Sequence, residues 1–183
     1  MGKTAMSRSE KSVKQSRKVR NDDLFRRADQ HWERGELRSA LRLFLAAAKA
    51  GDRSSQLNVG YFYNRGLGVR PERSSALFWY KRAYRNGDGC AASNIGTIWR
   101  DEQKPKRALY WFRQAVKLGD ADANLEIAKI FLRNEKDHKK SIPYLKRACR
   151  SNQVTEEKAE EARRLLKRGL RLHPSLRTSG LGT

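Results

Sequence analysis

Long apolar stretches are missing from this sequence. It contains no run of about twenty apolar residues, the length that a membrane-spanning helix requires. The first twenty residues are basic and polar and lack the apolar core of a secretory signal peptide. We therefore expect a cytoplasmic protein without a membrane partner.

Cysteine and histidine are scarce. Cys90 and Cys149 lie far apart without CxxC spacing, which in a chain without an export signal indicates reduced thiols. His31, His138 and His173 share no spacing typical of metal ligands. The sequence predicts no metal site.

Catalytic motifs are also missing. There is no GxSxG, GxxxxGK[ST] or HExxH, and no GxGxxG that follows a strand. The Gly-Leu-Gly at Gly66 to Gly68 is not followed by the Lys-Ser/Thr pair that would complete a phosphate-binding loop. We expect no catalytic residues and no cofactor, so the chain is not predicted to be an enzyme.

Acidic residues are few relative to basic ones. Lys and Arg total 41 against 20 Asp and Glu, which gives a formal net charge of +21. Such a charge favours acidic partners, either protein or nucleic acid. A basic tail at residues 1–20 could contact phosphates without sequence preference, or serve solubility alone. No RNP, KH, helix-turn-helix or zinc motif indicates a specific nucleic-acid fold.

The chain repeats a pattern of its own. Gly-Asp occurs at Gly51, Gly87 and Gly119, at intervals of 36 and 32 residues. A block with small, large and small apolar residues at spacings of four and three precedes each Gly-Asp, and a diverged copy follows the last. These spacings place the three residues of a block on one stripe of a helix. The stripes are Ala40/Phe44/Ala47, Ala76/Tyr80/Ala83, Ala108/Phe112/Ala115 and Ser141/Leu145/Ala148.

A second predicted helix lies upstream of each block and carries a small residue in its middle. The position is held by Ala28, Gly60, Gly96 and Ala128. Glycine inside a helix costs about 1 kcal/mol relative to alanine, so Gly60 and Gly96 require a packing reason. Close approach of the partner helix supplies it.

Each block is followed by a residue suited to end a helix. Gly51, Gly87 and Gly119 are predicted to adopt the left-handed conformation after the last helical turn. Asn152 is predicted to take this role in the fourth unit.

Residues 54–88 resemble a Sel1-like repeat. The resemblance rests on Gln56, Asn58, Gly60 and Tyr63, on Gly-Leu-Gly-Val at 66–69, and on Trp79-Tyr80 before Ala83 and Gly87. The flanking units lack the GxGV loop and have tetratricopeptide spacing instead. The resemblance covers about residues 21–152 and implies the fold much more than the function.

The fold class that we predict is all-α: an α-solenoid of about four stacked helix pairs plus a C-terminal capping helix. The expected units are about 21–52, 53–88, 89–120 and 121–152, followed by the cap at 153–174. Residues 1–20 and 175–183 are too polar to pack, and we expect both to be disordered.

Solenoid geometry predicts where a partner binds. The first helix of each pair lines the concave face, so its residues that point away from the small positions are the candidates for contact. The predicted partner-binding residues are Phe25, Trp32, Leu57, Tyr61, Asn64, Arg65, Thr97, Arg100, Lys129 and Arg133.

The sequence therefore predicts an adaptor or scaffold that binds a protein or peptide partner of acidic character in this groove. One alternative is a basic protein associated with nucleic acid through its tail and Arg-rich surface. A further alternative, by analogy alone, is an immunity-type inhibitor of a toxin.

Overall fold

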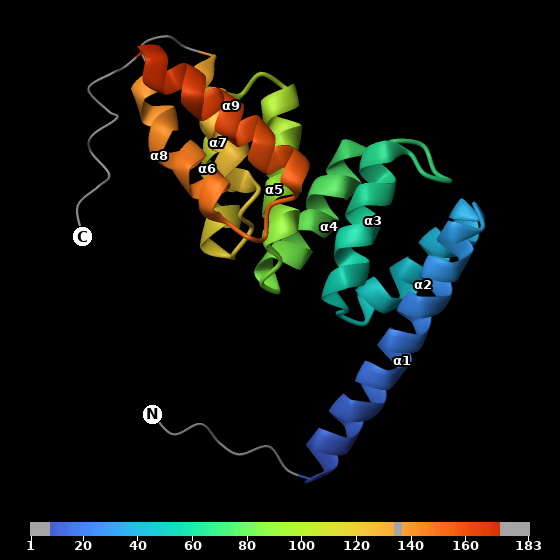
Figure 1. The fold of residues 1–183 in the computed structure, drawn as a ribbon. Coiled ribbons are helices and arrows are strands. Elements are labelled where there is room, and N and C mark those ends of the chain that lie inside the picture. The colour runs from blue at the N-terminus through green and yellow to red at the C-terminus, as the bar shows by residue number, and fades with distance from the viewer. Residues whose placement is uncertain (1–7, 134–136, 173–183) are drawn as a thin grey trace. The chain divides into compact units, whose positions relative to one another are not determined.

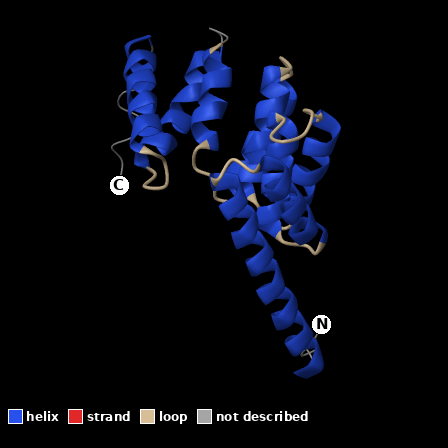
Figure 2. Ribbon diagram, turned by 90° about the vertical axis from the view of Figure 1, so that its right-hand side faces the viewer, coloured by secondary structure: helices blue, strands red, loops and turns tan. Residues whose placement is uncertain are grey.

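The computed structural model describes residues 8–133 and 137–172, and this part of the chain contains nine α-helices and no strand (Figure 2). The helices are α1 (Arg8–Glu33), α2 (Leu37–Lys49), α3 (Arg53–Arg65), α4 (Arg73–Arg85), α5 (Gly89–Asp101), α6 (Pro105–Lys117), α7 (Ala123–Leu132), α8 (His138–Arg150) and α9 (Glu156–Leu172). The all-α prediction is confirmed, and the predicted tail at 175–183 lies outside the described residues.

The chain divides into two compact units, residues 1–86 and 87–183. Within the first, α1 packs on α2, α2 on α3 and α3 on α4 (Figure 1). Within the second, α5 packs on α6, α6 on α7, α7 on α8 and α8 on α9. The main contacts in each unit thus join helices that are adjacent in sequence, as expected of a helical repeat.

The predicted apolar stripes form the core. All twelve of their residues, from Ala40 in α2 to Ala148 in α8, have no exposed surface. The large member of each stripe, such as Phe44 or Tyr80, fills the space between paired helices. The small members on either side let those helices come close together.

The two mid-helix glycines face these large residues. A Cβ atom at Gly60 would lie 2.5 Å from Cδ1 of Tyr80, and one at Gly96 would lie 2.8 Å from Cδ1 of Phe112. Real Cβ atoms do not approach other atoms so closely. The predicted packing reason for both glycines is therefore confirmed.

The Gly-Asp dipeptide ends one helix and begins the next. Gly51 and Gly87 have φ values of +99° and +84°, in the left-handed region that ends a helix. The carboxylates of Asp52 and Asp88 then accept hydrogen bonds from the backbone N–H groups of Ser55 (2.6 Å) and Ala91 (2.8 Å), which caps α3 and α5. Two residues thus carry both helix-end signals.

The fourth unit ends differently from the prediction. Asn152 is not in the left-handed region, because the chain leaves α8 in an extended conformation at Ser151 (φ −80°, ψ 126°). The proposed role of Asn152 is therefore wrong.

The Gly66–Val69 loop serves packing. Gly66 and Gly68 have positive φ values of +71° and +64°. A Cβ atom at Gly68 would lie 2.8 Å from backbone atoms at the start of α2, so only glycine allows the loop to lie against that helix. Leu67 and Val69 pack on the apolar core of the first unit.

Helix α1 begins earlier than predicted. Residues 8–20 are helical, which corrects the expectation of disorder for this part of the 1–20 tail; residues 1–7 lie outside the described residues. The segment has no Gly or Pro and consists largely of residues compatible with a helix, and it continues a helix that residues 21–33 hold against α2. Figure 1 shows this part of α1 extending past α2.

Candidate functional site

In the first unit, the predicted contact residues gather on one side of α1 and α3. Leu57, Tyr61, Asn64 and Arg65 lie at spacings that place them on one face of α3. Arg65 is exposed, and the other three are half-buried. The Arg65 guanidinium lies 5.8 Å from the centre of the Tyr61 ring, within cation–π range.

Trp32 of α1 joins this face to the core. Its ring centre lies 6.0 Å from that of Tyr61 and 5.1 Å from that of the buried Phe62. The Trp32–Phe62 pair is edge-to-face, and pairs of this kind contribute about 0.5–1.5 kcal/mol beyond the area that they bury. Half-buried Trp32 therefore stabilises the unit while part of its ring remains accessible.

Phe25 contributes mainly to packing in the core of the first unit. Its ring packs edge-on against Phe44, with centres 5.5 Å apart and an interplanar angle of 64°.

We name Trp32, Leu57, Tyr61, Asn64 and Arg65 the α3 patch.

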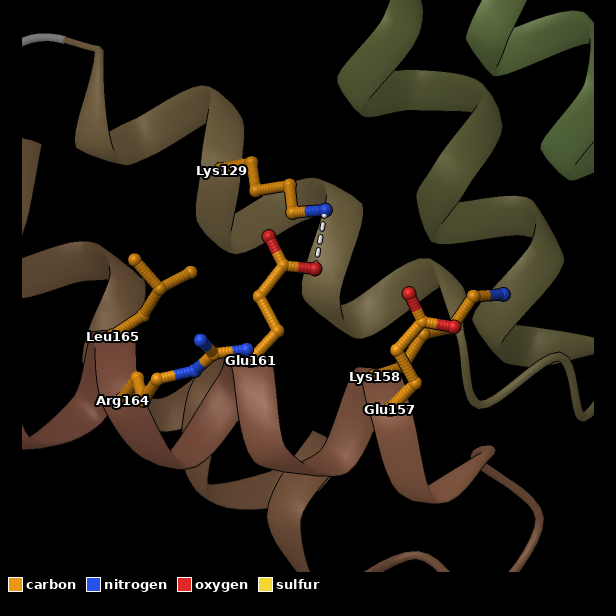
Figure 3. Close-up of a pocket in the computed structure, with 6 residues that line it drawn as sticks. All are labelled: Lys129, Glu157, Lys158, Glu161, Arg164 and Leu165. Atoms are coloured by element: carbon orange, nitrogen blue, oxygen red, sulfur yellow. Dashed lines mark ion pairs between the residues drawn. The ribbon is translucent and has the colours of Figure 1, made fainter.

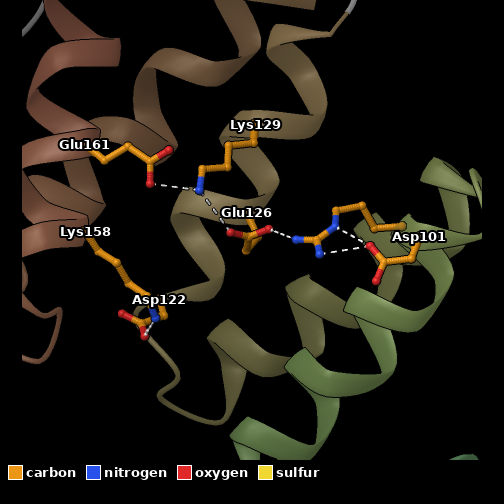
Figure 4. A network of polar contacts seen from close by, with 7 residues as sticks. Asp101, Asp122, Glu126, Lys129, Lys158 and Glu161 are labelled. Atoms are coloured by element: carbon orange, nitrogen blue, oxygen red, sulfur yellow. Dashed lines mark hydrogen bonds and ion pairs between the residues drawn. The ribbon is translucent and has the colours of Figure 1, made fainter. Parts of the chain in front are cut away.

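In the second unit, the predicted residues lie on α5 and α7. Thr97 is half-buried, and Arg133, which directly follows α7, is exposed. Arg100 and Lys129 are not free cations. Both belong to a network of ion pairs that crosses three helices (Figure 4).

This network runs from α5 through α7 to α9. Arg100 pairs with Asp101 (2.9 Å) and with Glu126 of α7, and Lys129 pairs with Glu126 (3.3 Å) and with Glu161 of α9 (2.9 Å). We name these five residues the charge ladder. Glu126 is its centre, because this carboxylate contacts both cations.

A separate pair joins Lys158 of α9 to Asp122, which precedes α7. Figure 3 shows the shallow hollow between α7 and α9 that Lys158 and ladder residues Lys129 and Glu161 line together with Glu157, Arg164 and Leu165. Both signs of charge meet in this hollow.

The ladder changes the pKa of its cations. Burial alone would lower the pKa of Arg100, but Asp101 and Glu126 outweigh it and hold the pKa above its ordinary value. Burial acts in the same way on Lys129, and Glu161 and Glu126 raise its pKa. Both cations stay charged, and their charge is balanced from within the unit.

The ladder carboxylates were not recognised from the sequence. Glu126 lies three residues before Lys129, a local spacing, but its other partner Arg100 lies 26 residues earlier, and Glu161 lies 32 residues after Lys129. The signals in the sequence were the Glu126–Lys129 spacing and the recurrence of charges of opposite sign at about one repeat length. Arg100 and Lys129, both predicted as partner contacts, are thus already paired with carboxylates of their own unit.

The thiols are poorly suited to nucleophilic chemistry. Burial raises the pKa of Cys90, and Asp120 and Asp88 add to the shift. Burial also raises the pKa of Cys149. Both groups are therefore largely protonated near neutral pH, whereas a reactive cysteine requires a lowered pKa.

Within residues 8–133 and 137–172, no three His, Cys, Asp or Glu side chains come together in a way that could hold a metal ion. Among the same residues, no helix is long and apolar enough to cross a membrane.

The stacked helix pairs, with small residues where helices cross and glycines where they end, define an all-α helical repeat protein of the α-solenoid class. The family model for the Sel1 repeat matches residues 36–52, 53–88, 99–120 and 134–153. These segments cover just over half of the chain, which belongs to the Sel1 repeat family.

Solved structures agree with this assignment. The chain is 21% identical to a Sel1 repeat protein from Oxalobacter formigenes, with a TM-score of 0.63 over 81% of this chain and 72% of that one. It is 17% identical to c5321, a protective antigen present in uropathogenic Escherichia coli strains that displays an SLR fold, with a TM-score of 0.62 over 81% of this chain and 38% of that one. The MamA protein gives 17% identity and a TM-score of 0.54, over 89% of this chain and 97% of that one. At these identities the likeness concerns the fold alone.

Proposed function

We propose that the chain is a non-catalytic scaffold that binds a protein or peptide through the first helices of its repeats, with the α3 patch as the principal contact. The observation that carries this proposal is the presence of Trp32, Tyr61 and Arg65 side by side on one partly exposed face. Trp, Tyr and Arg are the residue types that dominate binding energy at protein interfaces.

The patch is held in place before a partner arrives. Trp32 packs on Phe62 and Phe44, and Tyr61 packs on Trp32, so these rings lose little freedom on binding. Groups that are already ordered give more affinity for the same contact area. Rigid aromatic residues are therefore well placed as anchors.

The patch also indicates the chemistry of the partner. The Tyr61 and Trp32 rings suit an apolar or aromatic side chain, and the exposed Arg65 suits an acidic one. In the second unit, the ladder carboxylates balance the charges of Arg100 and Lys129, so we assign these two residues a mainly structural role. Thr97 and Arg133 remain candidate contacts.

The test compares two double variants in pull-downs from nuclease-treated lysate. Y61A/R65A removes the ring and the cation of the patch and is expected to lose a stoichiometric protein partner that the wild type recovers. Trp32 is left in place because its removal would also take away packing against Phe44 and Phe62 in the core.

The matched control is Y110A/R113A, which removes the same two residue types from exposed positions on α6, a second helix. This control is expected to keep the partner. Retention of the partner by Y61A/R65A, or loss of every partner on nuclease treatment, would contradict the proposal.

A further inference from the structure

The C-terminal half of α9 carries a cluster of basic side chains. Arg164, Lys167, Arg168 and Arg171 lie within eight residues, are all exposed and line one shallow hollow. We name these four residues the α9 cluster. None of them forms an ion pair with a carboxylate in the described part of the chain.

The acidic half of α9 does not neutralise this cluster. Glu161 pairs with Lys129 (2.9 Å) and Glu156 with Arg163 (2.8 Å). Two of the carboxylates of α9 are thus directed to other cations. Arg164 also borders the hollow that contains Glu157 and Glu161, but the hollow that all four cluster residues share is lined by basic side chains alone.

The helix dipole does not account for the cluster. Cations near the end of a helix interact favourably with its dipole, but this effect is confined to the last turn. Arg164 lies eight residues before the end of α9 at Leu172. Like charges one turn apart also repel each other, so the cluster lowers rather than raises the stability of the helix.

The apolar face of α9 is already used. Ala162 is fully buried, Leu165 and Leu166 pack on the core that includes Leu145, and a Cβ atom at Gly169 would lie 2.7 Å from Cδ1 of Ile142. The cluster therefore sits on an anchored helix, and Leu166, Leu170 and Cys149 line a second hollow beside Lys167 and Arg171.

We propose that the α9 cluster binds the phosphate backbone of nucleic acid. Guanidinium groups donate paired hydrogen bonds to phosphate oxygens, and backbone binding requires only charge and donors. Aromatic residues dominate many protein interfaces, and no aromatic side chain lines the hollow of the cluster or the hollow beside it. The net charge of +21 would also attract a polyanion from a distance.

The test measures binding by fluorescence anisotropy of a labelled 20-base-pair DNA duplex and a labelled 20-nucleotide single-stranded RNA. Four phosphate contacts predict a log–log salt slope of about −3.6 on the duplex. For R164Q/K167Q/R168Q/R171Q, we expect at least tenfold weaker binding of the favoured nucleic acid at 100 mM salt and a clearly shallower slope. R164Q/R168Q should give about half the change in slope, and circular dichroism checks that both variants fold.

The control removes the same number of charges from the other unit. R34Q/R38Q/R42Q/K49Q changes four exposed cations on and beside α2, and it should bind nearly as the wild type does. Equal loss in this control would show that bulk charge acts rather than the α9 cluster. A wild type that binds a labelled 20-residue polyglutamate peptide as tightly as either nucleic acid would assign the cluster to an acidic protein. Unchanged nucleic-acid binding by the α9 variant would also overturn the proposal.

Discussion

Individual residues in this protein have their strongest effect on packing where two helices cross. Gly60 lies under the ring of Tyr80, and Gly96 lies under that of Phe112. Both rings are fully buried and lie in a close-packed core, so they have no room to move. At these two positions, absence of a side chain is what the packing requires.

We therefore expect Gly60→Ala to lower the free energy of unfolding by about 1–3 kcal/mol, the usual cost of overpacking a core, even though alanine is the better helix former. Chemical denaturation followed by circular dichroism measures the change. The control is Gly169→Ala, whose added methyl would meet only the mobile end of Ile142, and this variant should stay within about 1 kcal/mol of the wild type. Equal stability of Gly60→Ala and the wild type would contradict the packing argument.

Residues that pack at helix crossings can be predicted from the sequence because they recur in successive repeats. The stripes and mid-helix glycines appear in register in successive units, and all of the stripe residues are buried. Trp32 could be located but not fully interpreted, because a tryptophan on a helix face can pack, bind or do both. Its contact with Phe62 depends on how α1 and α3 meet, which no local pattern specifies.

Helix α1 differs from the other helices because a long segment of it is not packed into an apolar core. Every side chain of residues 8–20 that the structure describes is exposed, and burial begins at Asn21. An isolated helix of this length is only marginally stable in water. Residues 8–20 are therefore helical mainly because they continue a packed helix.

Ser16→Pro is expected to reduce the helical circular dichroism signal while it leaves the unfolding midpoint unchanged, because the described side chains of this segment are exposed and bury no apolar core. Gln30→Pro makes the same change in the packed part of the same helix. There the lost hydrogen bond and the steric clash should cost about 3 kcal/mol or more. A fall in midpoint for Ser16→Pro that matches that of Gln30→Pro would show that residues 8–20 do pack.

The charge ladder connects helices that are distant in sequence. Glu126 and Arg100 are only 22% and 26% exposed, so salt screens this pair less than a surface pair. Because Glu126 contacts two cations, its loss affects two interactions at once.

We expect Glu126→Gln to lower the free energy of unfolding by about 1–2 kcal/mol at low salt and by less in 1 M NaCl, where ion pairs are screened. Denaturation at both salt concentrations measures the difference. Glu160→Gln removes an exposed carboxylate of α9 and should cost less than about 0.5 kcal/mol. A salt-independent loss for Glu126→Gln would indicate altered packing rather than a lost ion pair.

Helix boundaries were easier to predict than helix contacts. The glycine that ends a helix acts locally, so it could be predicted from the sequence, whereas the capping role of Asp52 and Asp88 was not predicted. The ladder depends on which helices become neighbours, and the helical start of α1 depends on the packed part that follows it. These features required three-dimensional coordinates.

Across the chain, packing within each unit is between neighbours in sequence. Stability in such arrays is close to a sum of local terms, so damage stays near the place where it occurs. The two compact units should therefore respond separately to core mutations.

Phe62→Ala is expected to speed amide hydrogen exchange in α1 to α4 much more than in α7 to α9, because it opens a cavity in the first unit at a cost of about 3–5 kcal/mol. Leu145→Ala should give the reverse pattern, since this residue is buried in the second unit. Mass spectrometry of peptides after exchange distinguishes these two patterns. Equal acceleration everywhere in both variants would show that the chain unfolds as one cooperative body.

The Gly-Asp junction also bears on how such a chain could have grown. A gene segment copied from the codon of Asp52 to that of Gly87 encodes α3 and α4 together with the start signal of the first and the stop signal of the second. The copy could be inserted at any other junction of this kind without a new linker. Tandem duplication could thus lengthen the array, because each added helix pair would carry its own start and stop signals.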